Sequence, residues 1–137
     1  MTNNGMTEPI LEAVSIEKHF SIGRRKIPVL QGVDLAIAPG ETVALLGASG
    51  AGKSTLLHVL GLLDPPSSGS VRFAGQPVHD LPIERRAALR HRQIGFVFQF
   101  YHLIPELDAL ENVLLGSMMS QGLLGWMRSR GSHRQHA

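Results

Sequence analysis

A short glycine-containing segment holds the residues whose types and spacing suggest chemistry. It consists of Gly47, Ala48, Ser49, Gly50, Ala51, Gly52, Lys53 and Ser54. Phosphate oxygens are clustered anions, and backbone N–H groups at a helix N-terminus are well placed to bind them. We expect Gly47 and Gly52 to supply unusual backbone dihedrals. Lys53 would neutralise the β and γ phosphates, and the Ser54 hydroxyl would bind Mg²⁺. The segment therefore predicts a site for a nucleoside triphosphate.

A glycine loop of this kind requires a strand before it and a helix after it. The apolar run from Thr42 to Leu46 is typical of a central parallel strand covered on both faces. After the loop, leucines recur at helical spacing, at Leu56, Leu57, Leu60 and Leu63. The Pro- and Ser-rich run from Asp64 to Gly69 ends the helix. The sequence thus predicts a strand–loop–helix unit.

The rest of the chain alternates between strand and helix patterns. Strands are predicted over residues 10–18, around Val33, Leu35 and Ile37, in a hairpin over 70–78 that turns at Ala74-Gly75, and over Ile94 to Phe98. Helices are predicted from Pro82 to Arg92 and on the face formed by Leu107, Leu110 and Leu114. This order favours an α/β fold.

Composition is that of a globular protein, with 137 residues, 43% hydrophobic and 18% charged. There is no cysteine, no apolar run of membrane-spanning length and no signal-peptide pattern, so we expect a cytoplasmic location. Three of the 13 Lys and Arg residues, Arg128, Arg130 and Arg134, lie in the acid-free stretch 112–137. Without them the net charge of +2 becomes −1, so the sequence gives little support for nucleic acid as a partner.

The residues around the glycine loop resemble the ABC-transporter ATPase family. The resemblance covers roughly residues 10–116 and is carried by Val29 to Leu35, Pro39-Gly40-Glu41, Ser54 to Leu57 and Gly61 to Gly69. It implies the P-loop core of an ABC ATPase, with an antiparallel β subdomain, that binds ATP and Mg²⁺ through the loop and Thr55.

Two residues outside the loop gain roles from the same resemblance. Gln99 matches the family's Q-loop glutamine, which contacts Mg²⁺ and the attacking water and relays nucleotide state to membrane subunits. Phe20 stands where the family has an aromatic residue that stacks on adenine. An ordinary core aromatic is the alternative for Phe20, and a polar residue ending a strand is the alternative for Gln99.

A narrower resemblance follows from Phe98 to Pro105 together with Ala109 to Val113. These segments are similar to the lipoprotein-releasing (LolD-type) and macrolide-exporter (MacB-type) subgroup. Its members are homodimers at the cytoplasmic face of the inner membrane that couple ATP hydrolysis to transport by transmembrane subunits. Exposed Phe100, Tyr101 and Leu103 would then dock a membrane partner, with core packing as the alternative.

Features that follow the Q-loop in the ABC ATPase family are not found in this sequence. Neither an LSGGQ-type signature nor an apolar strand ending in Asp-Glu is present, so the Mg²⁺ shell is incomplete and the carboxylate that polarises water is missing. We therefore divide the chain into residues 1–116, the N-terminal part of the ATP-binding domain, and a basic tail, 117–137. The tail is either the start of the helical subdomain or altered sequence. Two alternatives remain for the function of the whole chain: a nucleotide-binding fragment without ATPase activity and a small P-loop kinase.

Overall fold

A computed structural model of the chain describes residues 8–116 and divides into two units, with the boundary between Ala87 and Ala88. The predicted tail, 117–137, lies outside the described residues. Within residues 8–116, no helix has the length and apolar character needed to span a membrane.

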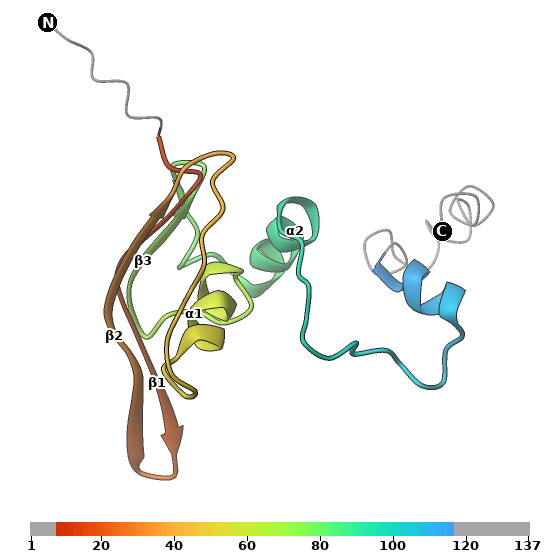
Figure 1. Ribbon diagram of the computed structural model, residues 1–137, viewed down its shortest axis with the longest axis horizontal. Helices are drawn as coiled ribbons and strands as arrows, with labels where there is room; N and C mark the ends of the chain where they lie inside the picture. The colour runs from red at the N-terminus through yellow and green to blue at the C-terminus, as the bar shows by residue number, and fades with distance from the viewer. Residues whose placement is uncertain (1–7, 117–137) are drawn as a thin grey trace, which may run out of the picture. The chain divides into compact units, whose positions relative to one another are not determined.

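The first unit is built on a four-stranded antiparallel sheet. Its strands are β1 (Leu11–Ile22), β2 (Arg25–Ile37), β3 (Ser68–Phe73) and β4 (Gln76–Pro77). They lie in the order β2-β1-β3-β4, with β1 between β2 and β3 (Figure 1). The sequence predicted β1, β2 and the hairpin of β3 and β4, although β1 and β2 extend further than expected. The predicted turn at Ala74-Gly75 joins β3 to β4, and both residues have the positive φ that a two-residue hairpin loop favours, 47° and 74°.

Irregularities interrupt the pairing of β1 with its neighbours. Ser15 has a φ of 49° and Gly32 a φ of 75°, and each lies where the register between β1 and β2 shifts. The Asp34 side chain supports the first of these bulges by accepting a hydrogen bond of 2.7 Å from the Ser15 N–H. Gly69 of β3 crosses the same bulge closely, because a methyl group at Gly69 would lie 2.3 Å from the Ser15 carbonyl oxygen. The middle of the sheet therefore depends on a glycine at this crossing.

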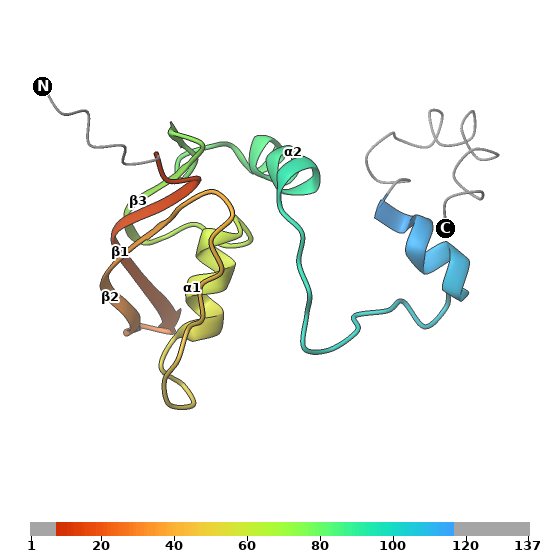
Figure 2. The ribbon, with the colours of Figure 1, turned by 45° about the horizontal axis from the view of Figure 1, so that its top comes forward.

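Helix α1 (Lys53–Leu60) packs along one face of the sheet (Figure 2). Its buried residues are Leu56, Val59 and Leu60, at the i, i+3, i+4 spacing of one helical face. They join Ala13, Ile16 and Val71 from the sheet in the core. The predicted helix is confirmed, but Leu57 is exposed and the helix ends at Leu60, where Gly61 donates its N–H to the Leu57 carbonyl oxygen at 2.9 Å.

Helix α2 (Ile83–Gln93) confirms the predicted Pro82–Arg92 helix to within one residue at each end. Glu84 occupies its first turn, while Arg90, His91 and Arg92 occupy its last, so its charges complement the helix dipole. Residues 109–116 are also helical, which confirms the predicted helix except that Leu107 precedes it, and Leu114 is buried.

Two predicted strands are wrong. Residues 42–46 and 94–98 run without strand pairing. Their apolar side chains are correspondingly open to solvent: Leu46 is 91% exposed and Val97 is fully exposed. A parallel strand exists only where neighbours satisfy its backbone groups and cover its faces. Within residues 8–116, no strand pairs with either segment.

Candidate functional site

The glycine loop lies between the extended segment 42–46 and the start of α1. Ala51 donates its N–H to the Ala48 carbonyl oxygen at 3.3 Å, which closes a turn in the middle of the loop. Both glycines predicted to supply unusual dihedrals have positive φ, 154° at Gly47 and 86° at Gly52. The loop thus has the backbone shape that its sequence predicts, and it leads directly into the first turn of α1.

Lys53 reaches back across the loop from the first residue of α1. Its ammonium donates hydrogen bonds to the carbonyl oxygens of Gly47, at 2.9 Å, and Ala48, at 2.6 Å. The positive charge therefore lies against the loop backbone. A phosphate held by the loop would meet this charge at short range, where charge-assisted hydrogen bonds are strongest.

The N-terminus of α1 favours an anion. Its N-cap, Gly52, has no side chain to accept from the first N–H groups, and no acidic residue occupies the first turn. These N–H groups carry the positive end of the helix dipole and have no acceptor within the helix. The Ser54 side chain is exposed in this turn, and Thr55 is half-buried beside it.

The loop is anchored to β2 at Gly52. A methyl group at this position would lie 3.0 Å from both Leu30 Cδ2 and the Val29 carbonyl oxygen. Phe20 pairs with Ile27, two residues along β2 from Val29. At a rise of about 3.3 Å per residue, this places Phe20 about 7 Å along the sheet from the contact. The ring is 42% exposed, so Phe20 is not a fully buried core aromatic.

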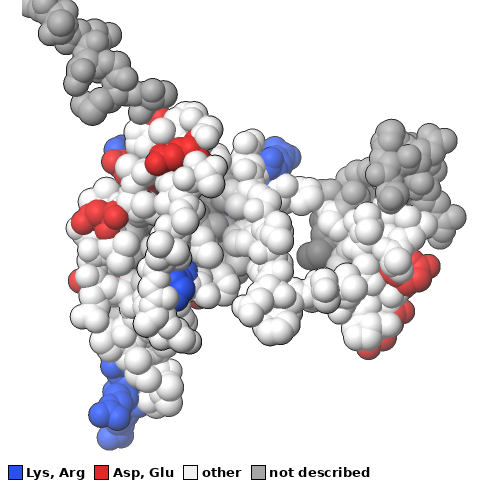
Figure 3. Space-filling model, in the orientation of Figure 1, with Lys and Arg blue, Asp and Glu red and all other residues white. Residues whose placement is uncertain are grey.

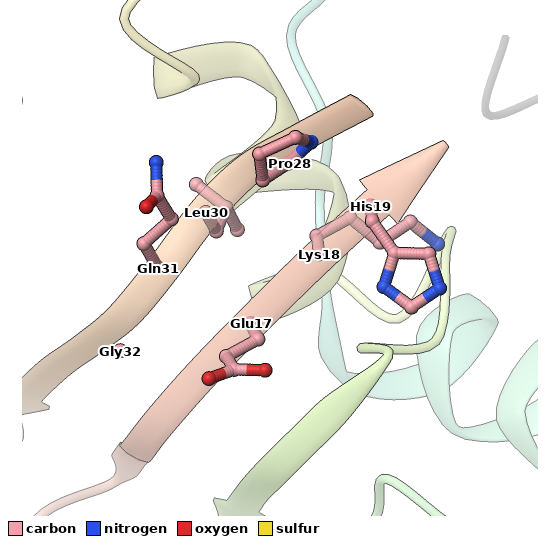
Figure 4. A pocket seen from close by; sticks show the side chains of 7 residues that line it. All are labelled: Glu17, Lys18, His19, Pro28, Leu30, Gln31 and Gly32. Atoms are coloured by element: carbon pink, nitrogen blue, oxygen red, sulfur yellow. The ribbon is translucent and has the colours of Figure 1, made fainter. Parts of the chain in front are cut away.

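A hollow of about 330 Å³ opens between β1 and β2 beside this region (Figure 4). It is lined by Glu17, Lys18, His19, Pro28, Leu30, Gln31 and Gly32. Two of its charged groups already have partners, because Glu17 accepts from the Ser68 hydroxyl at 2.8 Å and Lys18 donates to the Pro65 carbonyl oxygen at 2.7 Å. The hollow therefore belongs to the packing around β1.

Gln99 lies in the second unit, in an exposed bend that follows the extended segment 94–98. The glycine loop lies in the first unit. Their meeting at one Mg²⁺ stays a prediction from the family resemblance.

The segment that follows Gln99 is fixed by one amide side chain that the sequence reading did not single out. Asn112 accepts from the Ile104 N–H at 2.8 Å and donates to the carbonyl oxygens of Ile104, Leu107 and Asp108. Asp108 and Glu111 exchange side-chain-to-backbone hydrogen bonds of 2.7 and 3.0 Å. This is a capping box, and the Asp-x-x-Glu spacing before the leucine face was the available signal.

The apolar residues just before the segment held by Asn112 are exposed. Phe100 is 69%, Tyr101 91% and Leu103 64% exposed. Val97, which was expected in a buried strand, is exposed as well. Exposure at Phe100 to Leu103 is therefore compatible with docking but is not specific to it.

Exposed basic residues of the first unit cluster at one turn. Lys and Arg atoms cluster at the tip of the β1–β2 hairpin (Figure 3), where Arg24, Arg25 and Lys26 are exposed. This agrees with a solvated turn. Among residues 8–116, no group of three His, Asp or Glu side chains is placed to hold a metal ion.

The fold and the loop define a class of protein, the P-loop nucleotide-binding cassettes. The sequence profile of the ABC transporter family matches residues 30–136, and the chain belongs to this family. It is 53% identical over 106 residues to the lipoprotein-releasing system ATP-binding protein LolD of Geobacter metallireducens, a match that covers 77% of this chain and 47% of that protein. It is 48% identical over 129 residues to the macrolide export ATP-binding/permease protein MacB 1 of Aeromonas hydrophila subsp. hydrophila, covering 94% of this chain and 20% of that protein.

Solved structures agree with the family. A dimeric post-hydrolysis state of the ATP-binding cassette MJ0796, bound to ADP and Pi, matches with a TM-score of 0.76 and 36% identity. The match covers 91% of this chain and 54% of that one. The predicted fold class, the core of an ABC ATPase, is thereby confirmed, and the chain spans about half the length or less of the relatives described here.

Proposed function

We propose that this chain binds ATP–Mg²⁺ at the glycine loop and serves as ATP-binding part of an ABC transporter. The observation that carries the proposal is the Lys53 ammonium held against the loop backbone, directly before a helix N-terminus with no acidic residue in its first turn. Together these groups form a positive cradle for the phosphates.

The residues of the site fit Mg²⁺ held mainly by the nucleotide. Magnesium prefers oxygen ligands and is usually bound by few protein groups together with phosphates and water. The exposed Ser54 hydroxyl would be one oxygen ligand, and the Gln99 amide oxygen would be a second. When bound, the ion would neutralise charge on the phosphates. Ser54 would hold it beside the loop, while Gln99 would orient the attacking water.

Phe20 would supply the contact to the base. Its position about 7 Å along the sheet from the loop's contact with β2 suits a nucleotide whose phosphates lie in the loop. Its partly exposed ring would offer a face on which adenine stacks.

The transport process that this chain would drive is lipoprotein release from the inner membrane. The support is the similarity to several LolD proteins at 46 to 53% identity. The chain would act as a homodimer with transmembrane subunits, at the cytoplasmic face of the membrane, and exposed Phe100 to Leu103 would be the docking segment. Macrolide export is the second candidate, supported by the MacB similarity.

Steady-state phosphate release tests whether this chain also hydrolyses ATP. If it supplies a complete hydrolytic site, release will exceed that of a Lys53→Ala control at saturating ATP–Mg²⁺. A rate equal to the control would contradict hydrolysis by this chain. It would favour the alternative of a nucleotide-binding polypeptide without turnover, because general base catalysis typically supplies about 10² to 10⁴ in rate.

A further inference from the structure

Lys18 is a buried lysine on β1, and its surroundings account for its burial. Only 10% of its side chain is exposed, which is rare for lysine unless the ammonium is paired. The ammonium donates to the Pro65 carbonyl oxygen at 2.7 Å and lies 3.7 Å from Asp64 Oδ2. Both partners belong to the turn that follows α1. The contacts tie β1 to the end of the helix that begins at the glycine loop.

The same ammonium lies over the Phe20 ring, 5.3 Å from the ring centroid. Lys18 and Phe20 are two residues apart on one strand, so their side chains lie on the same face of the sheet. Lys18 pairs with Leu30, the residue that the glycine loop contacts through Gly52. The lysine thus lies beside the loop's contact with β2, two residues along β1 from the aromatic ring.

We propose that Lys18 is a positioning residue for nucleotide binding, which holds the Phe20 ring in the orientation that stacks on the base. An ammonium over an aromatic face is attracted by the ring quadrupole. Because Pro65 and Asp64 fix the ammonium, this attraction holds one face of the ring against the protein. The opposite face is left for the base. The inference rests on the proposed stacking role of Phe20.

The test compares two ligands that differ in the base. Calorimetry would give the affinity of the full chain for ATP–Mg²⁺ and for inorganic tripolyphosphate with Mg²⁺, which has phosphates only. Lys18→Met keeps a long apolar side chain and removes the ammonium. We expect it to lower the affinity for ATP about threefold to tenfold, with the affinity for tripolyphosphate unchanged. An equal loss for both ligands would show a structural role only and overturn the proposal.

Phe20→Ala separates this inference from the stacking role itself. It should cause the same base-dependent loss, and adding Lys18→Met to it should cause no further base-dependent loss. If Phe20→Ala leaves the ratio of the two affinities unchanged, the stacking role fails. If Phe20→Ala changes the ratio and Lys18→Met does not, stacking stands and the positioning role is overturned.

Asp64→Asn keeps the test decisive if Lys18→Met does not fold. Asp64 is 41% exposed, so this isosteric change leaves the core intact while it weakens the anchor of the ammonium. We expect a smaller base-dependent loss in ATP affinity, about twofold. No change in the ratio of the two affinities would contradict the proposal.

Discussion

Lys53→Ala is expected to lower the affinity for ATP–Mg²⁺ roughly tenfold to a hundredfold, measured by calorimetry. The substitution removes the charge that lies 2.9 Å from the Gly47 carbonyl oxygen and 2.6 Å from that of Ala48. Charge-assisted hydrogen bonds to phosphate are lost with it. The backbone N–H groups of the loop remain, so residual binding is expected.

Lys26→Ala is the matched control for charge. Lys26 is exposed at the start of β2, beside the turn of the β1–β2 hairpin, and its removal changes the net charge by the same amount. Exposed charges are screened over about 10 Å at ordinary ionic strength, so we expect less than about a twofold change in affinity. Equal affinities for the Lys53→Ala and parent chains would refute the phosphate role of Lys53.

Gly69→Ala is expected to destabilise the first unit by at least about 2 kcal/mol in urea unfolding. Gly69 has a φ of 87°, which an L side chain rarely adopts. A methyl group there would also lie 2.3 Å from the Ser15 carbonyl oxygen and 2.6 Å from that of Val14. Because these atoms belong to the backbone of β1, the strands must separate to accommodate it.

Gly40→Ala isolates the contribution of that contact. Gly40 has a similar φ of 77°, but a methyl group there would meet nothing within 4 Å. Its substitution should show only the backbone strain, about 1 to 2 kcal/mol. If both variants lost the same free energy of unfolding, the close crossing of β3 over β1 would not be what requires glycine.

Elements specified by local signals could be predicted from the sequence. The Ala74-Gly75 hairpin turn and the 82–92 helix carry their determinants within a few residues. The segments 42–46 and 94–98 could not be predicted in the same way. Their apolar pattern indicates a buried strand, but a buried parallel strand also needs neighbours, which lie elsewhere in a chain. Likewise, alternation along β1 gives no sign of the bulge at Ser15.

The residues of the candidate site also differ in whether local sequence predicts them. The loop from Gly47 to Ser54 could be predicted because its chemistry depends on contiguous residues with fixed spacing. Lys18 could not, because its partners Asp64 and Pro65 come together with it only when α1 packs on the sheet. The role of Gln99 still depends on the family resemblance, since it lies in a different unit from the loop.

The central claim is that the glycine loop binds the phosphates, and a paired titration tests it most directly. The full chain would be titrated with ATP–Mg²⁺ and with AMP under the same conditions. AMP has the same base and sugar but lacks the β and γ phosphates that Lys53 is expected to contact. The account predicts one ATP bound per chain and an affinity for AMP at least about tenfold lower. Equal affinities for the two nucleotides would contradict it.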